Sequence, residues 1–134
     1  MIFAGVKARK FAMKVLALDH VQIAIPPGGE DRAREFYSGV LGLAEVPKPS
    51  SMAGRGGCWF AAGSLNLHLG VEEDFHPAKK AHPALVVEGL DELLARGEAA
   101  GAALKPDVSF GGFRRFHIFD PFGNRLELME HIST

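Results

Sequence analysis

The chain has 134 residues, of which 47% are hydrophobic and 23% charged, as expected for one globular domain with a buried core. Its formal charge of −1 at pH 7 excludes the strongly basic balance typical of nucleic-acid-binding proteins. No apolar run approaches the roughly 18 residues of a membrane span, so we expect neither nucleic acid nor a membrane as a partner.

The first half of the chain predicts a strand, a helix and three more strands. Residues 16–25 alternate as a strand does and end at a run of prolines and glycines. Apolar residues then recur at the spacing of one helix face, which ends before Gly42: Ala33, Phe36, Tyr37, Val40 and Leu41. A short strand at 43–46, a mobile loop at 47–57 and a hairpin formed by 57–62 and 64–69 complete this half.

The second half repeats this plan after a polar linker at 72–80. A strand from 82, a helix from about 91 to Gly101, two strands at 103–108 and 113–119, a turn at 120–124 and a last strand are predicted in that order. The fold class is therefore α+β, with two paired βαβββ modules that form a curved mixed sheet around a cleft. We expect a loose tail at 1–14 and a single domain at 15–134, with modules at about 16–71 and 81–130.

Four polar residues stand alone among aliphatic residues in four predicted strands: His20, His68, His82 and Glu127. Alternation along a strand places each of them on the face opposite its aliphatic neighbours. The separation from His20 to His68 is 48 residues and that from His82 to Glu127 is 45. The two modules therefore place their candidate ligands at a similar spacing. Three imidazoles and one carboxylate suit a divalent first-row metal, with Zn, Ni, Fe, Mn and Co all compatible.

Glu127 is the strongest support for a metal site, because a carboxylate between leucines is costly to bury unless it is paired or bound to a cation. The alternative to a metal is an ion pair with Arg125. Three further residues are predicted to contact a substrate. Arg115 and His117 share a strand face and suit an anionic or oxygen-rich molecule, and Gln22 shares the face of His20. The alternative for Arg115 and His117 is an exposed polar strand face.

Cys58 is the single cysteine, which excludes an internal disulfide and fits a reducing, cytoplasmic location. Next to Trp59, it is expected to be a small core residue and not a nucleophile. His76 and His131 lie outside the pattern and are expected at the surface.

Five segments in order resemble the vicinal oxygen chelate superfamily, which includes glyoxalases, bleomycin resistance proteins and extradiol dioxygenases. The segments are LDHVQIAI, REFYSGVLGL, LHL, AHPAL and FDPFGNRLEL, and the resemblance covers roughly residues 17–130. It implies a homodimer whose metal sites are built from modules of two chains. It also implies metal ligands at His20, His68, His82 and Glu127, of which members with three ligands use all except His68.

The sequence departs from the typical residue patterns of two subfamilies, glutathione-dependent glyoxalase I and the fosfomycin enzymes. Ala24 and Glu72 stand where glutathione-dependent glyoxalase I typically has a basic residue and an asparagine, and residues 107–115 lack the Lys and Ser-rich loop of fosfomycin enzymes. We expect a glyoxalase-like enzyme of lyase or isomerase type that chelates a small substrate through vicinal oxygens. Glu127 or His68 would act as the base. The alternatives are a ring-cleaving Fe(II) dioxygenase and a non-catalytic binding protein of the bleomycin resistance type.

Overall fold

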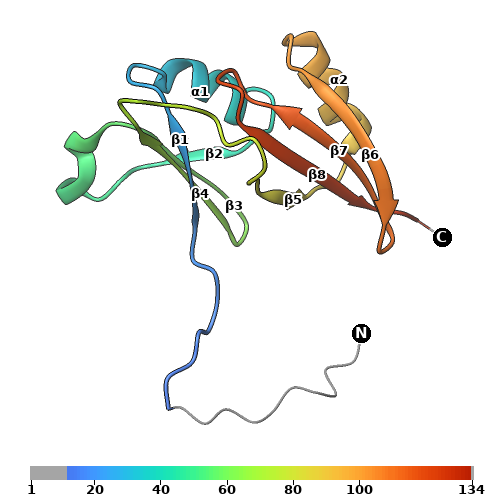
Figure 1. Cartoon of the computed structure of the whole chain (residues 1–134), viewed down its shortest axis with the longest axis horizontal. Coiled ribbons are helices and arrows are strands. Elements are labelled where there is room, and N and C mark those ends of the chain that lie inside the picture. The colour runs from blue at the N-terminus through green and yellow to red at the C-terminus, as the bar shows by residue number, and fades with distance from the viewer. Residues whose placement is uncertain (1–11, 134) are drawn as a thin grey trace.

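The computed structural model describes residues 12–133, so most of the predicted tail at 1–14 lies outside the described residues. Two modules follow each other along the chain (Figure 1). The first contains β1 (Val21–Ile25), α1 (Glu30–Tyr37), β2 (Ala44–Val46), the 3-10 helix η1 (Ser50–Arg55), β3 (Cys58–Ala62) and β4 (Leu65–Val71). The second contains β5 (Ala84–Val86), α2 (Leu90–Ala99), β6 (Leu104–Phe110), β7 (Phe113–Phe119) and β8 (Arg125–His131).

Each module forms one four-stranded sheet, and the two sheets have the same topology. Their strand orders are β1-β4-β3-β2 and β5-β8-β7-β6. The first strand of each module runs parallel to the last, and the remaining pairs are antiparallel. In Figure 1, α1 and α2 lie at the top of the molecule and the two sheets extend below them. The predicted fold class of two paired βαβββ modules is confirmed.

Residues from both modules form a single hydrophobic core. Leu67 and Leu69 of β4 and Leu126 and Leu128 of β8 are at most 1% exposed, whereas the residues between them face the other side of each sheet. This confirms the predicted alternation, which places His68 and Glu127 opposite the core. Cys58 is also buried there, and burial raises the pKa of its thiol to about 11, in agreement with a packing role.

The first strand is shorter than predicted. It begins at Val21 rather than at residue 16, because its parallel partner β4 starts only at Leu65 and Val21 pairs with Leu67. Residues 16–18 therefore extend beyond the end of the sheet, where Leu16 and Leu18 are 83% and 78% exposed.

Three other boundaries also differ from the predictions. Helix α1 ends at Tyr37 rather than Leu41, because the amides of Ser38 and Gly39 both bond to the carbonyl of Arg34 and the chain then turns. The predicted loop at 47–57 contains η1, and β5 begins at Ala84, two residues after His82. Gly42 has the positive φ of 74° that was expected after the helix.

The turn between β7 and β8 joins the two modules. The buried Asp120 carboxylate accepts hydrogen bonds from the backbone amides of Phe122 and Asn124, from the Asn124 side chain and from the Tyr37 hydroxyl of α1. The Asn124 side chain also donates to the carbonyl of Ala24 in β1, at 2.9 Å. This turn therefore fixes the start of β8 against the first module.

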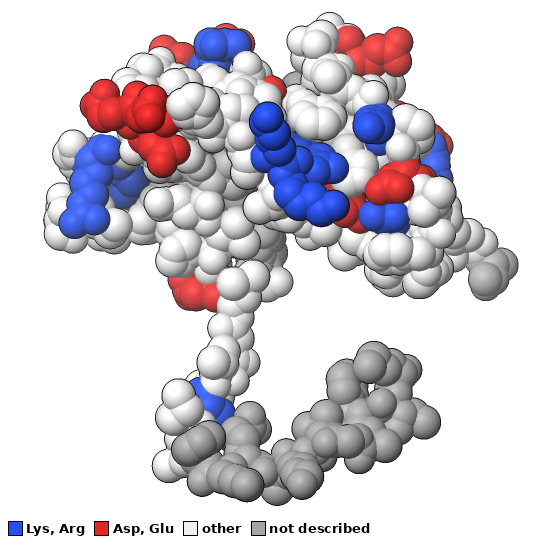
Figure 2. Space-filling view, in the orientation of Figure 1, with Lys and Arg blue, Asp and Glu red and all other residues white. Residues whose placement is uncertain are grey.

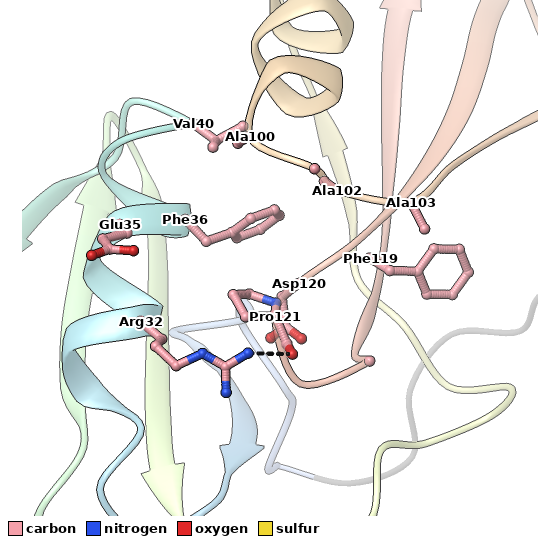
Figure 3. Close-up of a pocket in the computed structure, with 12 residues that line it drawn as sticks. Arg32, Glu35, Phe36, Val40, Ala100, Ala102, Ala103, Phe119, Asp120 and Pro121 are labelled. Carbon is pink, nitrogen blue, oxygen red and sulfur yellow. Dashed lines mark hydrogen bonds between the residues drawn. The ribbon is translucent and has the colours of Figure 1, made fainter.

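A cavity of about 650 Å³ lies beside this turn, between α1 and the segment that follows α2. Figure 3 shows Arg32 and Phe36 on one side of it and Phe119 and Asp120 on the other. Arg32 spans the junction and donates to the carbonyl of Pro121 at 3.1 Å.

The surface of the described residues carries small groups of basic and acidic side chains, which alternate over the face shown in Figure 2. Within residues 12–133, none of the helices has the length and apolar character needed to cross a membrane.

Candidate metal centre

His82 and Glu127 meet on the second sheet. Strand β5 pairs in parallel with β8 so that Ala84 lies opposite Glu127, and His82 precedes β5 by two residues. This register brings His82 Nε2 to 2.9 Å from Glu127 Oε1. The two side chains are 24% and 7% exposed, so the contact is largely shielded from water. The structure thus joins two of the predicted ligands, which are 45 residues apart in the sequence.

The hydrogen bonds of His82 show that its contact with Glu127 requires a cation. Its Nδ1 lies 2.9 Å from the carbonyl oxygen of Lys80, which is only an acceptor, so Nδ1 carries a proton. In the neutral ring, Nε2 then presents a lone pair to a carboxylate oxygen. Two acceptors 2.9 Å apart need a cation between them, either a second proton on His82 or a metal ion. The donor pair therefore fits the divalent metal that the sequence predicts.

Arg115 of β7 holds the other oxygen of this carboxylate. Its Nε donates to Glu127 Oε2 at 2.7 Å, and its Nη2 lies 3.0 Å from Asp107 Oδ2. The guanidinium also donates to the carbonyl of Val108 and stacks over the ring of Phe110, 4.2 Å from its centroid. In this structure the guanidinium of Arg115 binds two carboxylates and a carbonyl, and its predicted contact with a substrate stays a prediction.

Arg125, the alternative partner proposed for Glu127, is engaged elsewhere. Its guanidinium donates to the carbonyl of Lys79 at 2.6 Å. The ion-pair partner of Glu127 is thus Arg115, from the neighbouring strand β7. The pKa of the Glu127 carboxyl is lowered, first by its hydrogen bond to Arg115 and then by that to His82, against the opposing effect of burial. Glu127 is therefore ionised at neutral pH and available as a ligand.

His117 of β7 is the cross-strand neighbour of Glu127 and is 5% exposed. Its Nε2 lies 2.8 Å from Asp107 Oδ2, whereas its Nδ1 is buried and has no hydrogen-bond partner. His82, His117 and Glu127 each offer one potential ligand atom, and these three atoms lie within 4.8 Å of one another. His117 therefore belongs to the group around Glu127, on the face that its parity with Arg115 predicted.

Asp107 of β6 is the residue that the sequence analysis missed. It faces Arg115 across the β6–β7 pair and contacts both Arg115 and His117. The hydrogen bond to His117 lowers the pKa of the Asp107 carboxyl. A signal was present, because an acidic residue in the strand that precedes Arg115 and His117 is a natural partner for two cationic side chains.

His20, directly before β1, and His68 of β4 lie together at the first sheet. Their rings stack with centroids 4.2 Å apart, and the ring of Trp59 stacks on the other side of His68 at 3.7 Å. Burial, followed by the nearby His20, lowers the pKa of the His68 imidazole, which favours its neutral form. His20 Nδ1 lies 2.9 Å from the carboxylate of its neighbour Asp19.

The four predicted ligands thus form two groups within one chain, His20 with His68 and His82 with Glu127. In the described part of the chain, the group of three potential metal ligands contains neither His20 nor His68. Gln22 lines a separate cavity of about 480 Å³ between β1 and the segment before β5, and His82 also lines it.

We expect the Arg115→Met variant to lose stability at neutral pH and to lose less in acid. The lowered pKa of Glu127 means that this carboxylate stabilises the folded protein above its unfolded-state pKa, and that the contribution disappears as pH falls through the folded pKa. Without Arg115, the buried charge lacks its main partner until it is protonated. Urea unfolding midpoints measured at pH 7 and pH 4 should therefore converge for wild type and variant as the pH falls.

Arg114→Met is the matched control for this experiment. Arg114 is the chain neighbour of Arg115, and it pairs at 2.7 Å with Asp91, whose side chain is 83% exposed. We expect a small effect with little dependence on pH, because exposed ion pairs contribute little to stability. Equal losses in the two arginine variants at both pH values would contradict the role assigned to Arg115.

Known proteins share this architecture. The family model described as Glyoxalase/Bleomycin resistance protein/Dioxygenase superfamily matches residues 17–128. A glyoxalase family protein from Bacillus anthracis is 43% identical in sequence, with a TM-score of 0.83 over 90% of this chain and 99% of that one. One from Enterococcus faecalis is 25% identical, with a TM-score of 0.65 over 85% and 97%.

More distant structures share the fold. A mutant form of the fosfomycin resistance protein FosX from Listeria monocytogenes is 17% identical, with a TM-score of 0.72 over 90% of this chain and 95% of that one. None of the curated proteins matches the chain. The family model covers most of the chain and the repeated modules have its architecture, so this protein belongs to the glyoxalase/bleomycin resistance protein/dioxygenase superfamily.

Proposed function

We propose that this protein is a metal-dependent enzyme that performs lyase or isomerase chemistry on a small substrate chelated through two vicinal oxygens. The observation that supports this most strongly is the contact between His82 Nε2 and Glu127 Oε1 at 2.9 Å. The second atom of each group is already bound, His82 Nδ1 by the Lys80 carbonyl and Glu127 Oε2 by Arg115. Both remaining donors are therefore held in one orientation, as metal ligands typically are.

His20 and His68 complete the ligand set in this proposal. Because both belong to the first module and neither is in the group around Glu127, they would reach the metal from a second copy of the chain. The protein would then act as a homodimer of single-domain chains, with the domain at 15–134. A cytoplasmic location is part of the same proposal, because the single cysteine is buried and free.

When bound, the divalent metal supplies Lewis acidity for a developing negative charge on a substrate oxygen. The residues of the chain provide binding and proton transfer. Glu127 or His68 would accept the proton, and the lowered pKa values of both keep them in the basic form at neutral pH. Arg115, His117 and Gln22 would contact the substrate, and Arg115 also keeps Glu127 ionised and oriented.

Manganese belongs among the metals to be tested. The Listeria monocytogenes FosX mutant, which shares this fold, is described in complex with Mn(II) and 1S,2S-dihydroxypropylphosphonic acid. Zinc, nickel, iron and cobalt suit the same nitrogen and oxygen donors.

A ring-cleaving Fe(II) dioxygenase is the second candidate. Two histidines and one carboxylate within 4.8 Å of one another resemble the ligand set of non-haem iron oxygenases. This reading predicts oxygen consumption when the Fe(II)-loaded protein is given catechol. No oxygen uptake with catechol would exclude simple catechol cleavage and favour the lyase reading.

The test of the proposed function starts from metal-free wild-type protein titrated with Co(II), whose visible spectrum reports its ligands. Acetohydroxamate, which offers two oxygens to one metal, is then added. We expect tight uptake of Co(II), a spectral change on adding acetohydroxamate, and metal-dependent turnover of a hemithioacetal, which carries two vicinal oxygens. Absence of Co(II) uptake would overturn the proposal and leave a binding protein of the bleomycin resistance type as the better reading.

A further inference from the structure

The segment before β1, residues 12–20, forms an arm that extends away from both sheets (Figure 1). The side chain of Asn66 donates to the carbonyl of Asp19 at 3.1 Å and holds the end of the arm next to β1. Leaving many apolar side chains of one segment in water is unfavourable, so we expect the arm to have a partner outside its own chain. Four of the eight large hydrophobic residues exposed in the described part of the chain belong to it: Met13, Val15, Leu16 and Leu18.

A second apolar surface crosses the face of the second sheet that carries Glu127. Strand pairing sets Val86 beside Met129, and alternation along β8 puts Met129 on the face of Glu127. Phe110 pairs with Phe113, and its ring stacks on the guanidinium that binds Glu127. Val86 is 63% and Phe110 55% exposed, and the other two are half-buried. These four residues form an apolar strip: Val86, Phe110, Phe113 and Met129.

The arm and the apolar strip do not cover each other within one chain. Leu16 and Leu18 of the arm stay exposed, and so do Val86 and Phe110 of the strip. In a twofold dimer each copy can offer its arm to the strip of the other, so one contact is made twice and both surfaces are covered. A second copy of the chain is therefore the partner that suits both surfaces.

The proposed function gives the direction in which the arm would run. There, His20 at the end of the arm reaches Glu127 of a second copy. Leu18 and Leu16 precede His20 by two and four residues, so continued alternation places them on its side of the chain. Along β8, the face of Glu127 continues to Met129 in one direction and to Arg125 in the other. An apolar arm favours the direction of Met129, which leads onto the apolar strip.

We propose that the arm of each chain packs through Leu16 and Leu18 on the apolar strip of a second copy and so clasps the homodimer. This inference rests on the homodimer in the proposed function and names a surface that joins its two copies. It requires no change in the metal ligands, because the arm ends where His20 begins to act.

The first experiment mixes two forms of the full-length chain. One is Ala17→Cys with a nitroxide attached, on the side of the arm opposite Leu16 and Leu18, and the other is labelled with ¹⁵N. Cys58 is 2% exposed, so the nitroxide is expected to react at position 17. Broadening of ¹⁵N amide signals then reports contact between copies. We expect it at Val86 and Met129, and its absence there in a dimeric sample would overturn the inference.

The second experiment is sedimentation equilibrium of the metal-free protein. The double variant Leu16→Asp/Leu18→Asp should raise the dissociation constant of the dimer by at least about 100-fold, because two charges replace two buried side chains in each arm. Met13→Asp/Val15→Asp is the matched control on the other side of the arm. It should dimerise within about threefold of wild type, since exposed positions away from a contact are nearly neutral.

A change in the apolar strip tests the same contact from the second copy. Val86→Asp alters one exposed side chain and should raise the dissociation constant by about 10-fold or more. Equal weakening by the control and the Leu16/Leu18 variant would overturn the inference, because the contact would then not use one side of the arm. Unchanged dimerisation of Val86→Asp would also overturn it.

Failure of this inference and failure of the proposed function can be told apart. If wild type is a dimer and Leu16→Asp/Leu18→Asp dimerises as tightly, the role of the arm is wrong and the homodimer stands. If wild type dimerises only after Zn(II) is added, the arm is again wrong, because its packing needs no metal. If wild type is a monomer with and without Zn(II), the homodimer with its shared metal centre is wrong as well.

Discussion

Replacing His82 by alanine is expected to abolish tight metal binding and leave the chain folded. His82 contributes the nitrogen that lies 2.9 Å from Glu127 Oε1, and its loss leaves the carboxylate with Arg115 as its remaining side-chain partner. A site that loses an imidazole also loses the geometry that selects transition metals over other cations. We expect the affinity for Zn(II) or Co(II) to fall by at least about 1,000-fold, beyond the 10- to 100-fold typical of supporting residues.

The fold should survive this change, because His82 precedes β5 and takes no part in its strand pairing. The measurement is isothermal titration with Zn(II), together with near-ultraviolet circular dichroism as a check of tertiary structure. His76→Ala is the matched control, because His76 lines the same cavity as His82 but is exposed and outside the three-donor group. Undiminished metal binding by a folded His82→Ala protein would refute the assignment of this residue.

Replacing Asp120 by alanine is expected to produce a large loss of stability. Its buried carboxylate accepts four hydrogen bonds, two from backbone amides and two from the side chains of Tyr37 and Asn124. The variant leaves these donors buried without an acceptor, which we estimate to lower the free energy of unfolding by roughly 3 kcal/mol. Urea denaturation followed by tryptophan fluorescence measures this difference.

Tyr37→Phe is the graded comparison for Asp120→Ala. It removes one donor at 2.7 Å from Asp120 Oδ2 and keeps the turn itself intact. Because the lost bond has a charged acceptor, we expect a loss of about 1.5 kcal/mol, clearly below that for Asp120→Ala. Equal effects in the two variants would show that the carboxylate acts mainly through Tyr37 and not through the turn.

The turn also links stability to the metal centre, because it sets where β8 begins and Glu127 lies three residues after Asn124. Asp120→Ala protein that remains folded should therefore bind Zn(II) more weakly than wild type, whereas Tyr37→Phe should not.

Much of the fold could be predicted because alternation and helical spacing are local properties. The aliphatic residues of β4 and β8 face the core as their parity predicts, and the repeated βαβββ order follows from turns and apolar runs read along the chain. Strand ends were less predictable. Residues 16–18 have the alternation of a strand but extend past the start of β4, and only pairing with a neighbour decides where a strand begins.

The candidate site, like the fold, was predictable from sequence only in part. The sequence by itself determined that His68 and Glu127 lie opposite the core, and that Arg115 and His117 share one strand face, because these follow from a period of two residues. Tertiary structure alone decided the partners. The register of β7 with β8 puts His117 beside Glu127, and the register of β6 with β7 puts Asp107 beside Arg115. Register depends on contacts between segments distant in sequence. The sequence pattern therefore offered Arg125 as the alternative partner of Glu127, whereas the folded chain places Arg115 there.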